Sequence, residues 1–276
     1  MDQLKKTRLD FKISQAAAIS RKSATNLIKS SKVQVNNKII TKPSHLVASG
    51  DKLEIDQKAS SLSFKTPKLK VIYEDNDVVV IDKPVGLLTH SKGAYNPEAT
   101  VASWLHAKVP TMTGERSGIV HRLDRATSGV MILAKNEATL KFLQTQFSKR
   151  KTKKTYVAVV EGVPQKQHAV IDMPIERNPK KPQTFRVGPN GKTAQTEYRV
   201  ISHNDSTSLV ELKPVTGRTH QLRVHLQKIG HPIIGDTLYG TVEAERLYLH
   251  ARVLEITLPS GRRQVFESAL PKQFKI

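Results

Sequence analysis

One acidic side chain stands among basic ones immediately before an apolar segment. Asp124 lies between Arg122 and Arg125 in the tetrapeptide Arg-Leu-Asp-Arg, and an apolar run, 130–134, follows. Gly129 comes directly before that run and, having no side chain, lets another backbone or a ligand approach closely. The pattern predicts that Asp124 is held on a rigid shoulder where a buried strand begins, which suits a reactive carboxylate. Nearby guanidinium groups would favour its charged form.

The residue types alone leave several chemistries open for this segment. A structural ion pair needs nothing beyond the tetrapeptide. His121, Asp124 and Ser128 are the residue types of a hydrolytic triad, but the G-x-S-x-G turn that presents such a serine is absent. A glycosidase normally uses two carboxylates, and this region offers one.

Four histidines in the second half of the chain raise the question of a metal site. His220, His225, His231 and His250 follow neither H-E-x-x-H nor a comparable spacing. If the first two lie on one strand, their side chains project from opposite faces. The chain also has no cysteine, which excludes disulfides and thiolate zinc sites. We therefore expect no metal.

The charge of the chain points to a polyanionic partner. Its 276 residues contain 45 Lys and Arg against 24 Asp and Glu, a net charge of +21. Such a charge attracts nucleic acid, with solubility and affinity for membrane surfaces as the plainer alternatives. The longest apolar runs, such as 78–81, are far shorter than the roughly 20 residues that span a bilayer. We expect a cytoplasmic protein without a membrane segment.

A small basic unit is predicted over residues 1–58, followed by a Ser-, Lys- and Pro-containing linker, 59–69. Leu27 and Ile28 share one face of a predicted helix, and 33–35 alternates as a strand. Asn36 and Asn37 suit a tight hairpin turn, because asparagine tolerates positive φ. Twelve Lys and Arg against five acids give this unit a charge of +7. The basic helix, with Arg21 and Lys22, is expected to contact RNA.

The remainder, 70–276, is predicted to be α+β, with a mixed, mostly antiparallel sheet. Two apolar stretches around Glu-Asp-Asn-Asp form a hairpin signature over 69–84. Helices are predicted at 100–108 and 138–147 from apolar side chains spaced three to four apart. Strands are predicted at 156–161, 192–202, 208–213, 247–257 and 263–267.

Four segments, in order along the chain, resemble the motifs of the RluA-type pseudouridine synthases. They are IDKPVGLLTHSKG (81–93), HRLDRATSGVMILAKN (121–136), KTYVAVVEG (154–162) and GRTHQLRVHLQKIGHPIIGDTLYG (217–240). Residues 1–58 resemble the alpha-L RNA-binding domain, through matches such as Arg8-Leu9-Asp10 and Val33-Gln34-Val35-Asn36. Ser31 and Asn37 depart from that pattern, which usually has glycine there.

This resemblance implies the pseudouridine synthase fold and the isomerisation of uridine in RNA. The bond from uracil nitrogen to the anomeric carbon breaks, and carbon 5 of the turned base bonds to that carbon. No redox step or group transfer occurs, so the resemblance implies no cofactor. An alpha-L domain is common in family members that act on large-subunit ribosomal RNA, so ribosomal RNA is favoured over tRNA as the partner. We expect a monomer.

The resemblance also assigns roles to single residues. Asp124 would be the nucleophile, or the base that removes a ribose proton to give a glycal, and both routes stay open. Tyr156 would pack against the target uracil and help to remove the proton from carbon 5. Arg218 would pair with Asp124, and Arg122 would fill the gap that a flipped uridine leaves. Lys83 would shape the cleft and contact RNA.

Further RNA contacts are expected from Arg125 and from a basic run just before Tyr156. The run contains Lys149, Arg150, Lys151, Lys153 and Lys154. Placed in a loop beside the site, it would hold the RNA backbone. Two other functions stay open: a non-catalytic RNA-binding protein of ribosome assembly that keeps the fold, and a nucleic-acid glycosidase that releases free uracil.

Overall fold

The computed structural model describes residues 6–17, 21–56, 66–90, 98–112 and 118–276. It divides into two compact units, Met1–Pro67 with His90–Trp104, and Lys68–Thr89 with Leu105–Ile276. Residues 59–65 of the expected linker lie outside the described residues. The domain limits 1–58 and 70–276 therefore stay a prediction.

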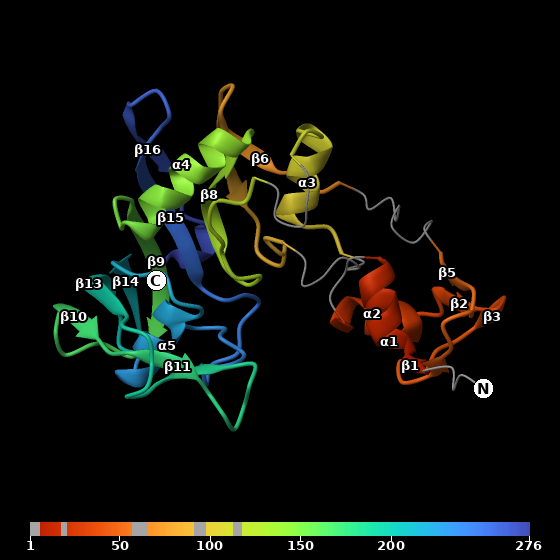
Figure 1. The fold of residues 1–276 in the computed structure, drawn as a ribbon. Coiled ribbons are helices and arrows are strands. Elements are labelled where there is room, and N and C mark those ends of the chain that lie inside the picture. The colour runs from red at the N-terminus through yellow and green to blue at the C-terminus, as the bar shows by residue number, and fades with distance from the viewer. Residues whose placement is uncertain (1–5, 18–20, 57–65, 91–97, 113–117) are drawn as a thin grey trace. The chain divides into compact units, whose positions relative to one another are not determined.

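The N-terminal part forms a small α/β fold around its own core (Figure 1). Its elements are β1 (Thr7–Arg8), α1 (Leu9–Ala16), α2 (Arg21–Lys29), β2 (Val33–Val35), β3 (Lys38–Ile39), β4 (Leu46–Val47) and β5 (Leu53–Ile55). β1 pairs with β4, and β2 lies between β3 and β5 in an antiparallel sheet. The core contains Leu27 and Ile28, which were predicted to share a helix face, and Val33 and Val35 of the predicted strand.

The hairpin turn of this unit also agrees with the prediction. Asn36 and Asn37 join β2 to β3 with φ angles of 50° and 65°. Ser31, which stands where the related pattern has glycine, also has a positive φ, 59°. Asparagine accommodates this region of backbone space more easily than most residues, so the turn forms without glycine.

A nine-stranded sheet organises the larger unit. Its elements are β6 (Lys70–Glu74), β7 (Val78–Lys83), β8 (Ser128–Ala134), α4 (Glu137–Ser148), β9 (Lys153–Glu161), β10 (His168–Asp172), β11 (Ile175–Arg177), β12 (Phe185–Val187), β13 (Gln195–His203), β14 (Thr207–Pro214), α5 (Gln221–Lys228), β15 (Leu249–Thr257), β16 (Arg263–Glu267) and a 3-10 turn, η2 (Lys272–Phe274). The sheet order is β10-β13-β14-β9-β15-β8-β7-β6, with β16 paired to β15 and β11–β12 as a separate hairpin. β15 and β8 are parallel, and the other neighbouring strands of this sheet are antiparallel.

Side-chain alternation along β9 defines two faces of this sheet. Tyr156, Ala158 and Val160 lie on one face and pack with Leu222 and Leu226 of α5. Val157 and Val159 lie on the other face, with Phe274. Figure 1 shows α4 beside β8 and β15, and α5 toward the β13–β14 end. The mixed, mostly antiparallel sheet confirms the predicted fold class.

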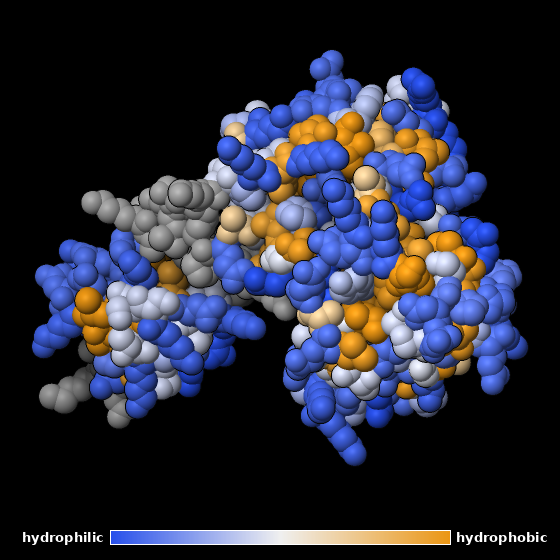
Figure 2. Space-filling view, turned by 180° about the vertical axis from the view of Figure 1, so that it is seen from behind, coloured by the Kyte–Doolittle hydropathy of each residue, from blue (hydrophilic) through white to orange (hydrophobic). Residues whose placement is uncertain are grey.

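Most predicted elements agree with the structure, with one clear error. The helices predicted at 100–108 and 138–147 correspond to α3 (Val101–Lys108) and α4. The segment that carries His220 and His225 is not a strand, because α5 begins at Gln221. β10, β11 and β12 were not predicted. Hydrophilic residues, in blue, cover much of the face drawn in Figure 2, with hydrophobic patches, in orange, between them.

Candidate active site

Asp124 lies in the segment that leads into β8, as the sequence predicted. β8 runs parallel to β15 at its start, where Gly129 is opposite Ala251. Gly129 has φ 119°, and a Cβ built there would lie 2.1 Å from the carbonyl oxygen of Ala251. Only glycine fits this close backbone approach, which confirms the expectation. The glycine therefore lets the strand behind Asp124 join the centre of the sheet.

Hydrogen bonds on both sides of Asp124 fix the backbone that carries it. The hydroxyl of Thr89 donates to the carbonyl of Leu123 at 2.7 Å, and the amide of Leu123 donates back to that hydroxyl at 3.3 Å. The amide of Gly86 donates to the carbonyl of Arg125 at 2.8 Å. The segment after β7 thus braces the residues before and after the carboxylate.

Lys83 belongs to the same brace, and its expected contact with RNA is wrong. Its side chain is fully buried, with 0% exposure. Its ammonium donates to the carbonyls of Pro84 at 3.0 Å, Leu87 at 2.8 Å and, more weakly, Arg125 at 3.4 Å. Burial lowers the pKa of Lys83 to about 7, partly opposed by the charge of Asp124. Lys83 shapes the loop from within.

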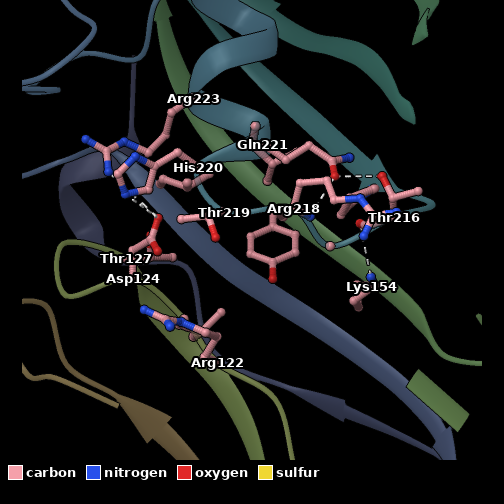
Figure 3. A pocket seen from close by; sticks show the side chains of 16 residues that line it. Arg122, Asp124, Thr127, Lys154, Thr216, Arg218, Thr219, His220, Gln221 and Arg223 are labelled. Carbon is pink, nitrogen blue, oxygen red and sulfur yellow. Dashed lines mark hydrogen bonds and ion pairs between the residues drawn. The ribbon is translucent and has the colours of Figure 1, made fainter. Parts of the chain in front are cut away.

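Asp124 has its polar partners, one of them charged, on the chain that enters α5. Its Oδ2 lies 3.7 Å from Nη1 of Arg223 and 3.8 Å from Nε2 of His220. The expected pairing with Arg218 is wrong, because the Nε of Arg218 donates instead to the carbonyl of Thr193 at 3.0 Å. Figure 3 shows the two partners beside Asp124, with Arg218 across the pocket.

The residues flanking Asp124 in the sequence take other places. Arg122 lines the pocket from below Asp124 in the view of Figure 3. Arg125 is exposed and is not among the pocket-lining residues. The guanidinium that pairs with the carboxylate of Asp124 is that of Arg223, which comes from far along the chain.

Arg223 is held in place by groups other than Asp124. Its side chain is 6% exposed and forms a two-pronged ion pair with buried Asp236, at 2.7 and 2.6 Å. Its guanidinium also lies 5.0 Å from the ring centroid of Tyr239. Burial opposes its charge, but the hydrogen bonds and charge of Asp236 raise the pKa of Arg223 overall. A permanent, oriented positive charge therefore faces Asp124.

His220 is oriented by a chain of hydrogen bonds. The amide of Phe185 donates to the hydroxyl oxygen of Tyr239 at 2.8 Å, and that hydroxyl lies 2.8 Å from Nδ1 of His220. The Tyr239 hydroxyl can then donate to Nδ1, which leaves the proton of His220 on Nε2, facing Asp124. Burial lowers the pKa of His220, which favours this neutral form.

A pocket of about 120 Å³ opens beside Asp124. Its lining is Arg122, Leu123, Asp124, Thr127, Lys154, Tyr156, Pro214, Thr216, Gly217, Arg218, Thr219, His220, Gln221, Leu222, Arg223 and Leu249. Asp124 is the one carboxylate among these lining residues. Burial, with a smaller contribution from the charge of Asp124, raises the pKa of Tyr156. Tyr156 is therefore a neutral phenol at ordinary pH.

Two wider hollows, of about 500 and 450 Å³, adjoin this pocket. The one toward α4 is lined in part by Arg122, Arg150 and Lys154. Lys154 lies on β9 two residues before Tyr156, not in a loop, and its ammonium is 3.5 Å from the carbonyl of Thr216. Burial, assisted by the charge of Arg150, lowers the pKa of Lys154 to about 8.

The other cations of the basic run lie outside the hollow. Lys149 and Lys151 are exposed between α4 and β9. Lys153, on the opposite face of β9 from Lys154, pairs with Glu255 at 3.4 Å. Of the N-terminal pair, Lys22 is exposed, whereas Arg21 binds Asp10 at 3.0 Å. Their contacts with RNA stay predictions.

The structure separates the residues of a hydrolytic triad. The hydroxyl of Ser128 lies 2.9 Å from Nδ1 of His250. His121 accepts the amide of Ile132 at Nε2, at 3.2 Å, and stacks on Phe147. Burial, with the charge of Lys154, lowers the pKa of His121 to about 3, so its ring is neutral. His121 fixes the loop to β8 and does not activate Ser128.

The histidines considered as metal ligands each bind protein groups. His225 contacts the hydroxyl of Thr196 and the carbonyl of Met173, and His231 contacts the carbonyl of Glu161. Within the described residues, no three side chains of the metal-binding types gather into a site. Nor does any helix within those residues have the length and apolarity needed to span a bilayer.

The sequence analysis assigned no role to Arg223, and it considered His220 only as a metal ligand. Their spacing of three places both at the same side of the start of α5. Leu222 and Leu226, four apart, carried the helical signal. A helix over 221–228 would have placed Arg223 beside His220 and left Arg218 in the preceding loop.

Comparison with known proteins identifies the families that this chain resembles. Residues 77–228 match the RNA pseudouridylate synthase family, and residues 7–53 match the S4 domain. The ribosomal large subunit pseudouridine synthase D of Borreliella burgdorferi is 39% identical over 238 residues, which cover 81% of this chain and 73% of that protein. The dual-specificity RNA pseudouridine synthase RluA of Escherichia coli is 40% identical over 209 residues, or 73% of this chain and 93% of that one.

A solved structure extends the match to the fold. Human RNA pseudouridylate synthase domain containing 1 superimposes with a TM-score of 0.62 and 30% identity, covering 75% of this chain and 85% of that one. The sheet, the residues of the site and both sequence matches fit the same protein family. The chain therefore belongs to the RNA pseudouridylate synthase family, RluA type, and is an RNA pseudouridine isomerase with an N-terminal S4 domain.

Proposed function

We propose that this enzyme isomerises uridines of large-subunit ribosomal RNA, in the cytoplasm, through Asp124. One observation carries the proposal: Asp124 is the one carboxylate among the residues lining the pocket, beside the ring of Tyr156 and the cations Arg122, Lys154, Arg218 and Arg223. The reaction needs one carboxylate, and no second acid lines this pocket to complete a glycosidase pair.

The isomerisation exchanges two bonds and one proton. The bond from nitrogen 1 of uracil to the anomeric carbon breaks, the base turns, and carbon 5 bonds to the same carbon. Carbon 5 loses its proton, and nitrogen 1 gains one. Asp124 acts either by attacking the anomeric carbon or by removing the neighbouring ribose proton. Both routes need a charged, oriented carboxylate, which Arg223 and His220 support from 3.7 and 3.8 Å.

Tyr156 supplies a packing surface for the uracil. Its raised pKa makes the phenolate costly, so it does not wait as a ready base for the proton on carbon 5. As a phenol it can accept that proton only by passing its own to another group. Packing of the ring against the base, with the hydroxyl as a hydrogen-bond donor, is therefore its principal role.

Arg122 stands where it can replace the flipped uridine in its stack. Arg122 is exposed, and it lines both the pocket beside Asp124, which we call the uridine pocket, and the wider hollow toward α4. Extruding a base costs a few kcal/mol, and a planar guanidinium that stacks on the neighbouring bases offsets part of that cost. The proposal places Arg122 between the RNA and the pocket entrance.

Ribosomal RNA is favoured by the appended S4 domain and by the charge. Residues 1–58 contribute +7 of the net charge of +21, and this charge lies outside the catalytic pocket. The name of the Borreliella burgdorferi relative specifies the ribosomal large subunit, and the Escherichia coli relative is named dual-specificity.

Release of tritium from uridine labelled at carbon 5 tests the proposal. The full chain is incubated with unmodified transcripts of large-subunit ribosomal RNA and, separately, of tRNA. We expect tritium release from the ribosomal transcript without free uracil, at a level that exceeds release from tRNA. Free uracil would indicate a glycosidase. Binding without release from either RNA would indicate a non-catalytic RNA-binding protein.

A further inference from the structure

The second wide hollow beside the uridine pocket has no role in the chemistry described above. We name it the hairpin hollow; its volume is about 450 Å³. Its lining is Ile175, Glu176, Arg177, Phe185, Asn190, Gly191, Lys192, Gly217, Arg218 and Thr219. Gly217, Arg218 and Thr219 also line the uridine pocket, so the two spaces are adjacent.

A guanidinium and an aromatic ring form a flat surface in this hollow. The Cζ of Arg177 lies 5.0 Å from the ring centroid of Phe185, and Nη1 of Arg177 donates to the carbonyl of Pro182. Phe185 packs against the buried Val224, and its ring meets that of His220 edge to face at 5.5 Å. Val224 and His220 therefore hold the ring of Phe185 in place.

The charge of the hollow is positive. Its one acid, Glu176, is bound by Arg186 at 2.7 Å, so its charge is already balanced. Arg177, Lys192 and Arg218 remain as cations of the lining. Because its Nε is directed to the carbonyl of Thr193, Arg218 is fixed at the boundary of the two spaces. Its two terminal nitrogens can still bind phosphate oxygens.

An RNA strand that delivers one nucleotide to the pocket must continue on both sides of it. On the α4 side, Arg150 and Lys154 line the path. The hairpin hollow lies on the other side of Arg218 and supplies what a single-stranded nucleotide recognises, a flat stacking surface and cations for phosphate. Arg218 lines all three spaces.

We propose that the hairpin hollow binds a nucleotide adjacent to the target uridine. Its base stacks on the Arg177–Phe185 pair, and Lys192 and Arg218 bind its phosphate. This inference deepens the proposed function, since it assumes an RNA substrate. Its test measures binding apart from turnover, so it can fail while the isomerase assignment stands.

The first test uses a fluorescein-labelled oligouridylate of ten nucleotides and the full chain. Phe185→Leu keeps an apolar side chain in the hollow but removes the stacking ring, and Phe185→Tyr restores the ring. We expect Phe185→Leu to weaken binding about 10-fold, within the range for loss of one stacked base, and Phe185→Tyr to bind like the parent. Equal affinities for all three proteins would overturn the stacking role.

The second test measures the phosphate contacts through salt. Lys192→Gln is compared with Lys213→Gln, which removes the same charge from an exposed site outside the lining. Each lost phosphate contact should reduce the slope of log affinity against log salt by about 0.7. A reduction in the hollow variant but not in the control supports the proposal, and equal slopes in both overturn it.

A third measurement separates binding from an indirect effect through His220. Single-turnover tritium release is measured over a range of ribosomal transcript concentrations, and Phe185→Leu should raise the concentration needed for the half-maximal rate more than it lowers the saturating rate. A large loss of the saturating rate with unaltered oligouridylate affinity would show that Phe185 acts by supporting His220, and the nucleotide subsite would be rejected. Thermal unfolding of each variant confirms that it is folded before the comparison.

Discussion

Replacing Arg223 by methionine should lower the rate of isomerisation far more than it lowers RNA affinity. Arg223 lies 3.7 Å from the Asp124 carboxylate, whereas Arg218 is bound to Thr193. At 3.7 Å, two unit charges attract by about 4.5 kcal/mol at an effective dielectric constant of ~20 and by about 1 kcal/mol in bulk water. The Asp124 side chain is 21% exposed, which places the site between these limits. We expect a loss of about 100-fold, or ~2.7 kcal/mol.

The design must separate this loss from unfolding, because Arg223 also neutralises buried Asp236. Removing one partner of such a pair costs about 3–5 kcal/mol of stability. Asp236→Asn is therefore combined with Arg223→Met. The introduced asparagine is neutral, and its side-chain oxygen can still accept the amides of Leu238 and Tyr239. Asp236→Asn alone keeps the charge of Arg223 and serves as the control.

Single-turnover rates at saturating RNA and equilibrium binding are measured for both variants and for Arg218→Met. Arg218→Met should weaken binding and reduce its salt slope by about 0.7, with little change in the saturating rate. The reverse pattern, a lost rate in Arg218→Met and a retained rate in the double variant, would refute the pairing of Asp124 with Arg223.

Three further predictions concern Lys83, the hollow toward α4 that Lys154 lines, and the N-terminal unit. Lys83→Met leaves buried carbonyls without their hydrogen-bond donor, so the free energy of unfolding should fall by about 2 kcal/mol and the saturating rate should drop. RNA affinity, measured by filter binding, should stay unchanged. Weaker RNA binding with no loss of stability or rate would indicate that Lys83 contacts RNA after all. A lysine is charged below its pKa, so RNA affinity should fall as pH rises through about 8, and Lys154→Gln should remove that step in fluorescence anisotropy; a step that persists would belong to another group. Deleting residues 1–58 removes +7 and leaves +14, so the salt slope for ribosomal RNA should become shallower while the saturating rate persists; a lost rate in a folded fragment would mean that this unit helps to build the active site.

The sheet was largely predictable because its strands carry one-dimensional signals. β16 matches the predicted 263–267, and the hairpin of β6 and β7 follows from two apolar stretches around four polar residues. α5 was not predicted as a helix, because Leu222, Val224 and Leu226 alternate with polar residues. Such alternation over a short segment is typical of a strand and obscures the four-residue spacing of Leu222 and Leu226.

The carboxylate of the site was predictable, but its partner was not. Asp124 stands out in the chain because it is flanked by cations and precedes a buried strand. Whether Arg218 or Arg223 reaches Asp124 depends on the residue at which α5 begins. A helix start that is predicted from sequence can be wrong by a few residues, which is enough to exchange the two arginines. Lys83 was misassigned for a different reason. Its partners are backbone carbonyls brought together by tertiary folding, and residue types do not reveal them.

Substitution of Asp124 by asparagine tests the central claim most directly. The amide keeps the shape of the side chain but removes its charge and its basicity. Tritium release from labelled ribosomal RNA should fall to background, and RNA affinity should stay within a few-fold of the parent. Asp82→Asn, on β7 and outside the lining of the uridine pocket, is the matched control and should retain its rate. Substantial turnover by Asp124→Asn would contradict the assignment of this carboxylate to the chemistry.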